Sequence, residues 1–304
     1  MLNYLIVLIT LLLTVTANSQ NNFNGFDVNN SIIPKNEILS GGPPKDGIPA
    51  ILQPKFITAD KANWLKDNDF VAGISIKGEK RAYPVRILVW HELVNDNVGN
   101  VPILITYCPL CGSIIAFSRS PDKKELTFGV SGLLYQSDVL FYDHQTGSLW
   151  SQLEMKAISG KYVNTDLEVI PYIFSTWKEW KENNPETLVL SKDTGHIRDY
   201  DRDPYTSYYS SKNIMFPVNN KSERFHPKER VLVVISGDSS KAYPFKALSK
   251  RKIINDSIGD EKITIKSNGN NYFDVRNNNG ELKKYLIAYW FAWYTFKPDT
   301  LVFE

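Results

Sequence analysis

The chain contains two cysteines, Cys108 and Cys111, which lie in the stretch ITYCPLCGSI with two residues between them. This spacing suits a metal-binding thiolate pair, a redox-active dithiol or a structural disulfide. In a thioredoxin-like dithiol, the first cysteine caps a long helix that lowers its pKa. Here Cys111 is followed by glycine and then by β-branched and aromatic residues, which favour a strand. Two strands joined by a Cys-Pro-x-Cys-Gly turn are typical of a metal-binding knuckle.

A metal at this knuckle needs further ligands, because a full zinc ribbon uses a second cysteine pair and the chain has none. His91 is the best candidate, since it lies on a predicted short helix just before the strand that ends in the knuckle. A Cys2His set with an open position suits a catalytic or transfer site for one transition-metal ion, zinc or copper. Soft thiolates in an exported protein favour copper. A redox dithiol and an inert pair, disulfide-bonded or buried as thiols, remain as alternatives.

Two polar segments supply further candidates for this site. The first, LYQSDVLFYDHQTGSLWSQ (134–152), lies between predicted strands, and we expect Asp138 to be catalytic and Trp150 and Gln152 to line a pocket. In the second, TGHIRDYDRDPYTSYY (194–209), Arg198 and Tyr200 are expected to be catalytic, with Arg198 binding an anionic group and Tyr200 positioning it. The simpler interpretations are a polar hairpin that turns at 145–147 and a salt-bridged loop.

The elements that position these residues occur twice. RAYPVRILVWHELVNDNVGN (81–100) aligns without gaps to KAYPFKALSKRKIINDSIGD (241–260), and TWKEWKENNPETLVL (176–190) aligns to YWFAWYTFKPDTLVF (289–303). Two such pairs in the same order indicate that one structural unit was duplicated. The second copy has Arg251 in place of His91 and lacks cysteine. The repeated residues are therefore predicted to form the scaffold, and the residues unique to the first copy are the candidates for chemistry.

The patterns predict a β-rich α+β fold, an internally duplicated unit of antiparallel or mixed sheet with short helices. Short β-branched runs predict strands, and helical spacing of apolar residues predicts helices at 84–94 and 175–183. The expected strands are 71–76, 102–107, 113–117, 126–130, 139–142, 231–235 and 263–266.

The expected order of units begins with a signal peptide over 1–19, because 5–15 is apolar and Ala17-Asn18-Ser19 offers small residues for cleavage. The mature chain is then exported, periplasmic or extracellular, with no stable membrane insertion. Scattered charges with a net charge of +2 argue against nucleic-acid binding, so an unidentified small molecule is the expected substrate. The other units are an N-terminal arm (20–55), copy one with the Cys/His site (56–190), a connecting loop (191–229) and copy two as scaffold (230–304).

Several long motifs resemble, in order, the family called domain of unknown function 3179. They are AYPVRILVWHELVND, VPILITYCPLCGSIIAFSR, LTFGVSGLLYQSDVLFYDHQTGSLWSQ, RDYDRDPY and KAYPFKAL. The resemblance implies that the histidine of the WHE motif and the Cys-Pro-x-Cys pair are His91, Cys108 and Cys111. It also implies a role for Arg198, Asp199 and Tyr200, and it argues against His144 as a ligand because the family usually has arginine there.

Together these features predict an exported metal-binding protein with a Cys2His site, formed by His91, Cys108 and Cys111. A metal-dependent oxidoreductase of unknown substrate is the leading function. The alternatives are a thiol–disulfide oxidoreductase that uses Cys108 and Cys111, and a non-enzymatic binding module with a structural disulfide.

Overall fold

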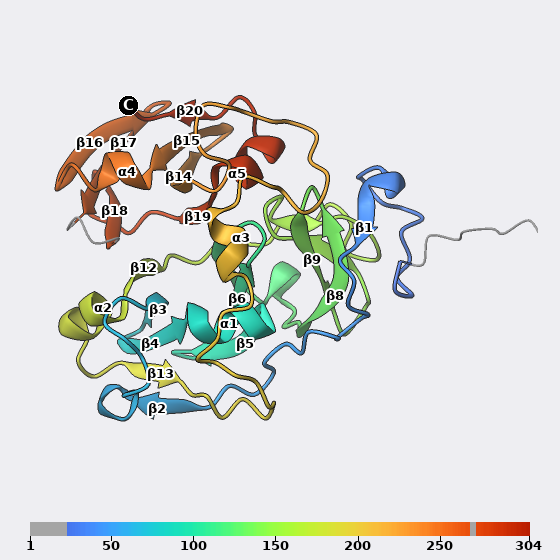
Figure 1. Cartoon of the computed structure of the whole chain (residues 1–304), viewed down its shortest axis with the longest axis horizontal. Helices are drawn as coiled ribbons and strands as arrows, with labels where there is room; N and C mark the ends of the chain where they lie inside the picture. The colour runs from blue at the N-terminus through green and yellow to red at the C-terminus, as the bar shows by residue number, and fades with distance from the viewer. Residues whose placement is uncertain (1–22, 268–271) are drawn as a thin grey trace, which may run out of the picture.

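The computed structural model describes residues 23–267 and 272–304, so the expected signal peptide lies outside the described residues. In the described part, strands form four sheets that are accompanied by a few short helices (Figure 1). This confirms the predicted β-rich α+β class. Within the same part, no helix is long and apolar enough to cross a bilayer.

The first copy of the repeated unit is a sheet with strand order β12-β3-β4-β13-β2. Its β12–β3 and β3–β4 pairs are antiparallel, and its β4–β13 pair is parallel. The helix predicted at 84–94 is shorter, because the backbone of Glu92 turns to φ 58° and ends it after His91. The elements are β2 (Phe56–Thr58), β3 (Phe70–Ile76), β4 (Glu79–Pro84), α1 (Val85–His91), β12 (Ile173–Thr176), α2 (Trp177–Asn183) and β13 (Leu188–Leu190).

The second copy repeats this arrangement, with strand order β19-β14-β15-β20 and the same sequence of antiparallel and parallel pairs. The predicted duplication is therefore confirmed by the topology. A separate three-stranded sheet, β16-β17-β18, adjoins it. The elements are β14 (Arg230–Ser236), β15 (Ser239–Pro244), α4 (Phe245–Leu248), β16 (Ile253–Ile258), β17 (Glu261–Ser267), β18 (Phe273–Asn277), β19 (Tyr285–Tyr289), α5 (Trp290–Phe296) and β20 (Leu301–Val302).

Residues shared by the two copies make the same contacts in both. The indole nitrogen of Trp180 donates to the hydroxyl of Thr187 at 2.9 Å, and Trp293 donates to Thr300 at 3.0 Å. The interpretation of the repeated residues as scaffold agrees with these matched bonds. Tyr83 and Tyr243 likewise donate to Asp96 and Asp256.

The two copies join through one continuous seven-stranded sheet, ordered β20-β15-β14-β19-β7-β6-β5. The joint is the pairing of Ile114 on β7 with Ile287 on β19. Strands of the first copy therefore extend the sheet of the second. These strands are β5 (Leu93–Val98), β6 (Val101–Cys108) and β7 (Ser113–Ser118).

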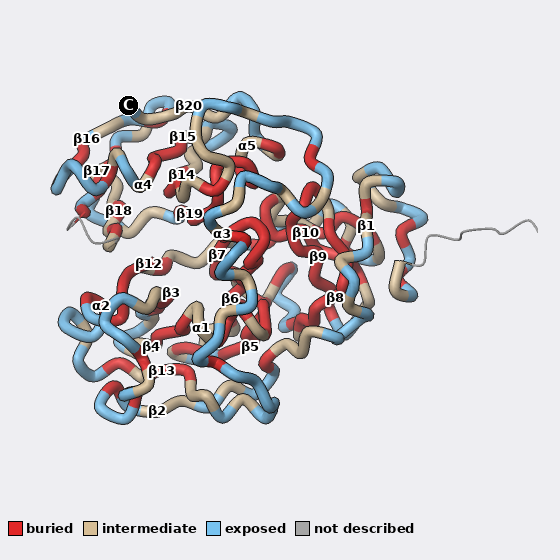
Figure 2. Tube along the Cα trace, in the orientation of Figure 1, coloured by how far each residue is buried: buried red, intermediate tan, exposed pale blue. Residues whose placement is uncertain are grey.

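The segment unique to the first copy forms the remaining sheet, ordered β1-β8-β9-β10-β11, in which the N-terminal arm supplies the edge strand β1. The strands around β6 to β10 form the most deeply buried part of the molecule (Figure 2). The elements are β1 (Ile38–Ser40), β8 (Phe128–Tyr135), β9 (Asp138–Asp143), β10 (Leu149–Ser151) and β11 (Lys156–Ala157). The chain also forms α3 (Thr206–Ser210) and the 3-10 helices η1 (Lys35–Glu37), η2 (Ala59–Lys61) and η3 (Pro121–Lys123).

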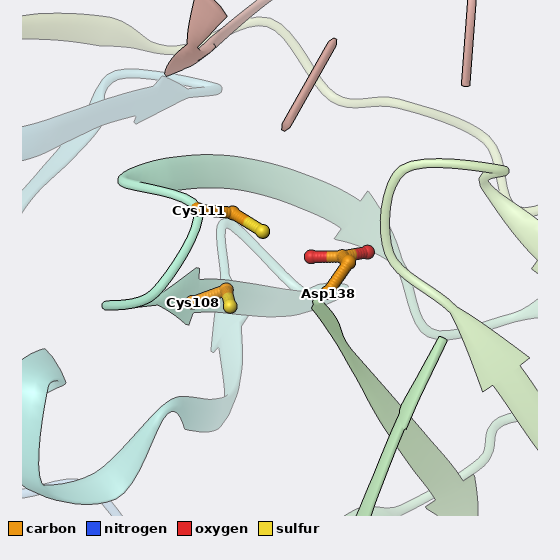
Figure 3. Close-up of side chains that lie close together, drawn as sticks. All are labelled: Cys108, Cys111 and Asp138. Carbon is orange, nitrogen blue, oxygen red and sulfur yellow. The ribbon is translucent and has the colours of Figure 1, made fainter. Parts of the chain in front are cut away.

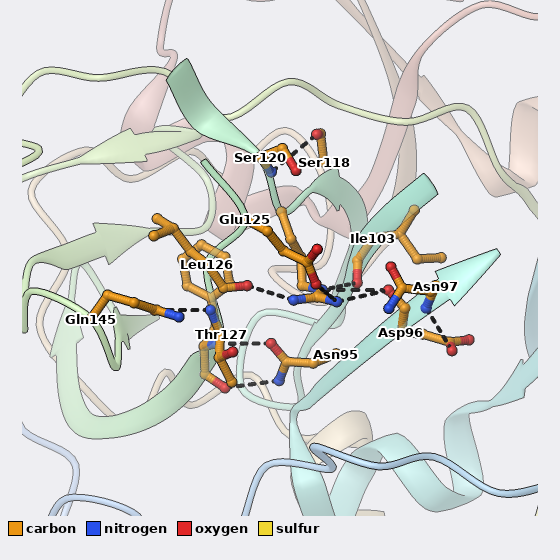
Figure 4. Close-up of polar contacts among 12 residues, drawn as sticks. Asn95, Asp96, Asn97, Ile103, Ser118, Ser120, Glu125, Leu126, Thr127 and Gln145 are labelled. Carbon is orange, nitrogen blue, oxygen red and sulfur yellow. Dashed lines mark hydrogen bonds and ion pairs between the residues drawn. The ribbon is translucent and has the colours of Figure 1, made fainter. Parts of the chain in front are cut away.

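Buried polar side chains fasten this added sheet to β5 and β6 (Figure 4). Asn95 on β5 exchanges two hydrogen bonds with the backbone of Phe128, at 2.7 and 2.9 Å. The buried guanidinium of Arg119 donates to the carbonyl groups of Ile103 and Leu126 at 2.9 and 2.5 Å. These bonds fix the position of β8 and β9 relative to the strand that ends at Cys108.

Candidate metal centre

The two cysteines lie on a tight turn between β6 and β7, as the knuckle pattern predicts. Cys108 ends β6, and β7 begins at Ser113, which pairs with Cys108. Gly112 has φ 55°, and a Cβ atom there would lie 2.6 Å from the ring of Tyr289. The Tyr289 amide also donates to the carbonyl of Cys111 at 2.7 Å. The turn is therefore shaped both by its own glycine and by a strand of the second copy.

Cys108, Cys111 and Asp138 bring three donor atoms together. The two sulfurs and one Asp138 carboxylate oxygen all lie within 4.8 Å of one another, and all three residues are buried. Both cysteines are free thiols. Figure 3 shows the side chains converging from the β6–β7 turn and the start of β9, with one carboxylate oxygen directed at the sulfurs. This group, hereafter the Cys2Asp cluster, could hold a metal ion.

The turn between β8 and β9 delivers the third donor. Its two residues, Gln136 and Ser137, both have left-handed backbone conformations, with φ 52° and 67°. This conformation directs the Ser137 carbonyl at the thiols, so that it lies 3.2 Å from Cys111 Sγ and 4.0 Å from Cys108 Sγ. The Gln136 side chain holds the turn through hydrogen bonds with Glu37, Asn219 and Thr295, from three distant segments.

Asp138 is only partly satisfied by the protein. Its Oδ2 accepts a hydrogen bond from the amide of Leu153 at 3.0 Å. Its Oδ1 is buried, and among residues 23–267 and 272–304 no donor reaches it with normal hydrogen-bond geometry, although the weakly donating thiols of Cys108 and Cys111 approach the carboxylate there. A buried carboxylate oxygen without a donor is costly unless a cation or a proton satisfies it. The cluster therefore contains an oxygen atom that is available as a ligand.

Burial controls the protonation of the cluster. It raises the pKa of both thiols, most strongly that of Cys111, and it raises the pKa of the Asp138 carboxyl to about 7. Without a cation, the thiols are therefore neutral near pH 7, and they are weak nucleophiles. A bound metal would reverse this state by displacing the protons and pairing with the thiolates.

Glu92 is a buried acid close to the cluster that the sequence reasoning missed. Burial and, to a smaller extent, the charge of Asp138 together raise the pKa of its carboxyl to about 8. Its backbone carbonyl accepts from the amide of Tyr107, the residue before Cys108. The signal in the sequence was a glutamate inside an apolar run, between His91 and Leu93.

The structure does not bring His91 to the sulfurs, so Asp138 is the third member of the cluster in its place. Nδ1 of His91 lies 2.7 Å from the carbonyl of Pro49, and Nε2 lies 2.6 Å from the hydroxyl of Tyr200. Burial lowers the pKa of His91 to about 4, so the ring is neutral. Because a carbonyl can only accept, Nδ1 carries the proton and Nε2 accepts from Tyr200. His91 is thus fully occupied in joining the arm to the 194–209 loop.

The sequence profile of one family, described as "Protein of unknown function (DUF3179)", matches residues 45–287 of the chain. The chain belongs to this family. The matched residues include the whole Cys2Asp cluster as well as His91. No curated protein and no solved structure matches the chain.

In this member of the DUF3179 family, the other predicted site residues take separate places. Tyr200 is buried against His91 and also contacts Thr194 at 2.6 Å. Arg198 is exposed and donates to the carbonyl of Ile197. Two predicted pocket residues are buried in hydrogen-bond networks: Trp150 donates to Asp143, and Gln152 bonds with Ser113 and Thr106.

Proposed function

We propose that this chain is a metal-binding protein and that the Cys2Asp cluster holds one zinc ion. One observation carries the proposal: three buried donor atoms converge within 4.8 Å, and within the described part of the chain the Oδ1 atom of Asp138 has the two thiols beside it but no hydrogen-bond donor of normal geometry. Thiolate and carboxylate are both normal zinc ligands, at about 2.3 and 2.1 Å from the ion. Ligand atoms in a tetrahedral zinc site therefore lie about 3.6 Å apart, which the cluster accommodates.

The Ser137 carbonyl supports a fourth coordination position. It lies 3.2 Å and 4.0 Å from the two sulfurs, on either side of the separation expected in a tetrahedral site. With this oxygen as a ligand, the site would be closed. Without it, the fourth position would be open to water or substrate, as in catalytic zinc sites.

The donor set favours zinc over copper. Copper(I) prefers soft sulfur and imidazole ligands, whereas the third side chain here is a hard carboxylate, Asp138. Zinc has no redox chemistry of its own, so the metal-dependent oxidoreductase predicted from the sequence would need a separate redox partner at a zinc site. Exchange between thiol and disulfide is disfavoured by the raised pKa of both buried thiols, since the thiolate is the reactive form.

The test is metal content and zinc affinity of purified full chain and of single variants. Cys108→Ser, Cys111→Ser and Asp138→Asn should each reduce bound zinc from one equivalent to a small fraction, measured by elemental analysis and by chelator competition. His91→Gln should retain zinc, because His91 is not in the cluster. Asp193→Asn, an exposed aspartate paired with Lys55, is the matched control for Asp138→Asn.

Three results would overturn the proposal. Purified protein that binds no zinc after reduction excludes a zinc site. Loss of zinc in His91→Gln, with retention in Asp138→Asn, supports the Cys2His set instead. A metal-free protein whose Cys108–Cys111 disulfide is reduced near the glutathione potential supports the thiol–disulfide oxidoreductase.

A further inference from the structure

A cavity of about 420 Å³ lies where the two copies meet, separate from the Cys2Asp cluster. It is bounded by the starts of β3 and β14, by α1, by the end of β6 and by the 200–209 segment, which includes most of α3. Pockets at the junction of two structural units are common binding sites, and this volume suits a small molecule. Its walls include Phe70, Val85, Val89, Tyr107, Tyr209 and Arg230.

Arg230 places a positive charge in this junction cavity. Its guanidinium carbon lies 4.7 Å from the ring centre of Phe70 and 5.9 Å from that of Tyr289. Among residues 23–267 and 272–304, Arg230 makes no ion pair. Phe70 and Arg230 are the first residues of the equivalent strands β3 and β14. The two copies therefore carry an aromatic ring and a cation at the same position, and these two side chains pack together where the copies meet.

The acidic residues that line the same cavity are already engaged. Asp69 pairs with Arg86 at 2.7 Å, and Asp201 pairs with Lys192 at 3.2 Å. Asp203 accepts a hydrogen bond from the hydroxyl of Tyr209 at 2.9 Å. The hydroxyl of Tyr209 is neutral, so Asp203 keeps its negative charge, but four basic and three acidic side chains line the cavity and its net charge is positive.

Tyr107 adds a hydrogen-bonding group to the same wall. Its hydroxyl is buried, and within the described part of the chain its one polar neighbour is the hydroxyl of Tyr209, which does not meet normal hydrogen-bond geometry. A buried hydroxyl without a partner is uncommon in folded proteins, and it is satisfied when a ligand supplies the acceptor. Next to it, Val85, Val89 and Phe70 provide an apolar surface.

We propose that the junction cavity binds a small organic anion through its carboxylate group. The guanidinium of Arg230 pairs with the carboxylate, the hydroxyl of Tyr107 donates to it, and the apolar part of the ligand packs on Phe70 and the two valines. This proposal does not depend on the metal, because no residue of the Cys2Asp cluster lines the cavity.

The test uses benzoate as the probe, with benzamide as its uncharged analogue of the same shape and inorganic phosphate as an anion without an apolar part. Calorimetric titration of the full chain should show saturable benzoate binding that is unaffected by a zinc chelator. Arg230→Gln should weaken it at least about tenfold, and Tyr107→Phe should weaken it about threefold. Arg230→Lys keeps the charge and should restore part of the affinity.

The matched control is Arg224→Gln, which removes a partly exposed arginine that lines a different cavity. It should bind benzoate like the unmodified chain, and circular dichroism should show that all variants remain folded. The proposal is overturned if benzoate does not bind, if Arg230→Gln binds it unchanged, or if benzamide binds equally well. Phosphate binding as tight as that of benzoate would refute the role of the apolar surface.

Discussion

The donors of the Cys2Asp cluster are positioned by backbone conformations that few residues adopt. Cys111 precedes a glycine at φ 55°, and Asp138 follows a serine at φ 67°. Left-handed conformations in a non-glycine residue cost free energy, and they persist where the surrounding structure enforces them. The strained β8–β9 turn and the converging donor atoms lie next to each other, and both features indicate a functional site at the Cys2Asp cluster.

His91 is the residue whose charge state should be most visible in the stability of the protein. Its pKa is about 4 in the folded chain, below the ordinary 6.5, so below pH 6.5 the unfolded chain binds a proton that the folded chain does not. Stability from this residue is therefore lost as the pH falls from 6.5 toward 4. His91→Gln keeps one donor and one acceptor without titrating. Between pH 7 and pH 5, the free energy of unfolding of the unmodified chain should fall by about 2 kcal/mol relative to that of His91→Gln.

Urea unfolding of both proteins at the two pH values measures this difference directly. Groups other than His91 titrate in both proteins, so their contributions cancel when the two proteins are compared. The same difference at both pH values would show that His91 is not a neutral, buried imidazole. Tyr200→Phe removes the hydroxyl that is bonded to Nε2. The pKa of His91 should then rise only part of the way from about 4 to the ordinary 6.5, because burial is the main cause of the shift.

At the scale of elements, the same residue serves different purposes in the two copies. Asn95 on β5 is buried and fastens β8 through Phe128, whereas its counterpart Asn255 is exposed and accepts from Thr264 within its own hairpin. In the first copy, the β5–β6 hairpin is therefore the attachment point for the additional sheet. The Cys2Asp cluster forms between the end of this hairpin and the β8–β9 hairpin.

The β8–β9 turn offers a test of how strain and the site are related. Ser137→Gly should raise the free energy of unfolding by about 1 kcal/mol, because glycine tolerates φ 67° and the buried hydroxyl of Ser137 has no partner. Zinc binding should persist, since the carbonyl remains. Chemical unfolding and chelator competition measure the two quantities.

Gln136→Gly is the contrasting variant in the same turn. It relieves a similar backbone conformation, φ 52°, but removes hydrogen bonds to Glu37, Asn219 and Thr295. It should therefore lower stability by about 2 kcal/mol and weaken zinc binding. Equal effects of the two substitutions would show that the side chain of Gln136 does not position the turn.

At the scale of the whole molecule, sequence patterns predicted local elements better than they predicted which elements meet. The strand after Cys111 follows from β-branched residues, and the duplication follows from matched motifs. The partners of His91, by contrast, lie 42 residues before it and 109 residues after it. Asp138 was expected to be a catalytic residue rather than a metal ligand, and its approach to the sulfurs depends on how the added sheet docks. The spacing of residues along the sequence does not predict contacts between such distant segments. The three-dimensional structure was therefore needed to show that Asp138, and not His91, lies beside the two sulfurs.

The second copy is predicted to be essential to the first. A chain that ends at residue 229 lacks β19, which pairs with β7, and lacks Tyr289, which holds the Cys111 carbonyl. It should be poorly soluble, should lack a cooperative thermal transition and should not bind zinc, because an apolar strand edge becomes exposed. Size-exclusion chromatography, calorimetry and zinc titration alongside the full chain measure this. A soluble, zinc-binding 1–229 chain would show that copy one is independent.

The contact between Tyr289 and Cys111 also has a consequence for the order in which the molecule is built. Ribosomes deliver the cysteines long before they deliver β19, so every nascent chain passes through a stage with its knuckle incomplete. During that stage, the thiols lack the buried setting that raises their pKa in the finished protein, and they react more readily with oxidants and with each other. Protection of these thiols is therefore a property that the chain acquires only after β19 has been made and has paired with β7.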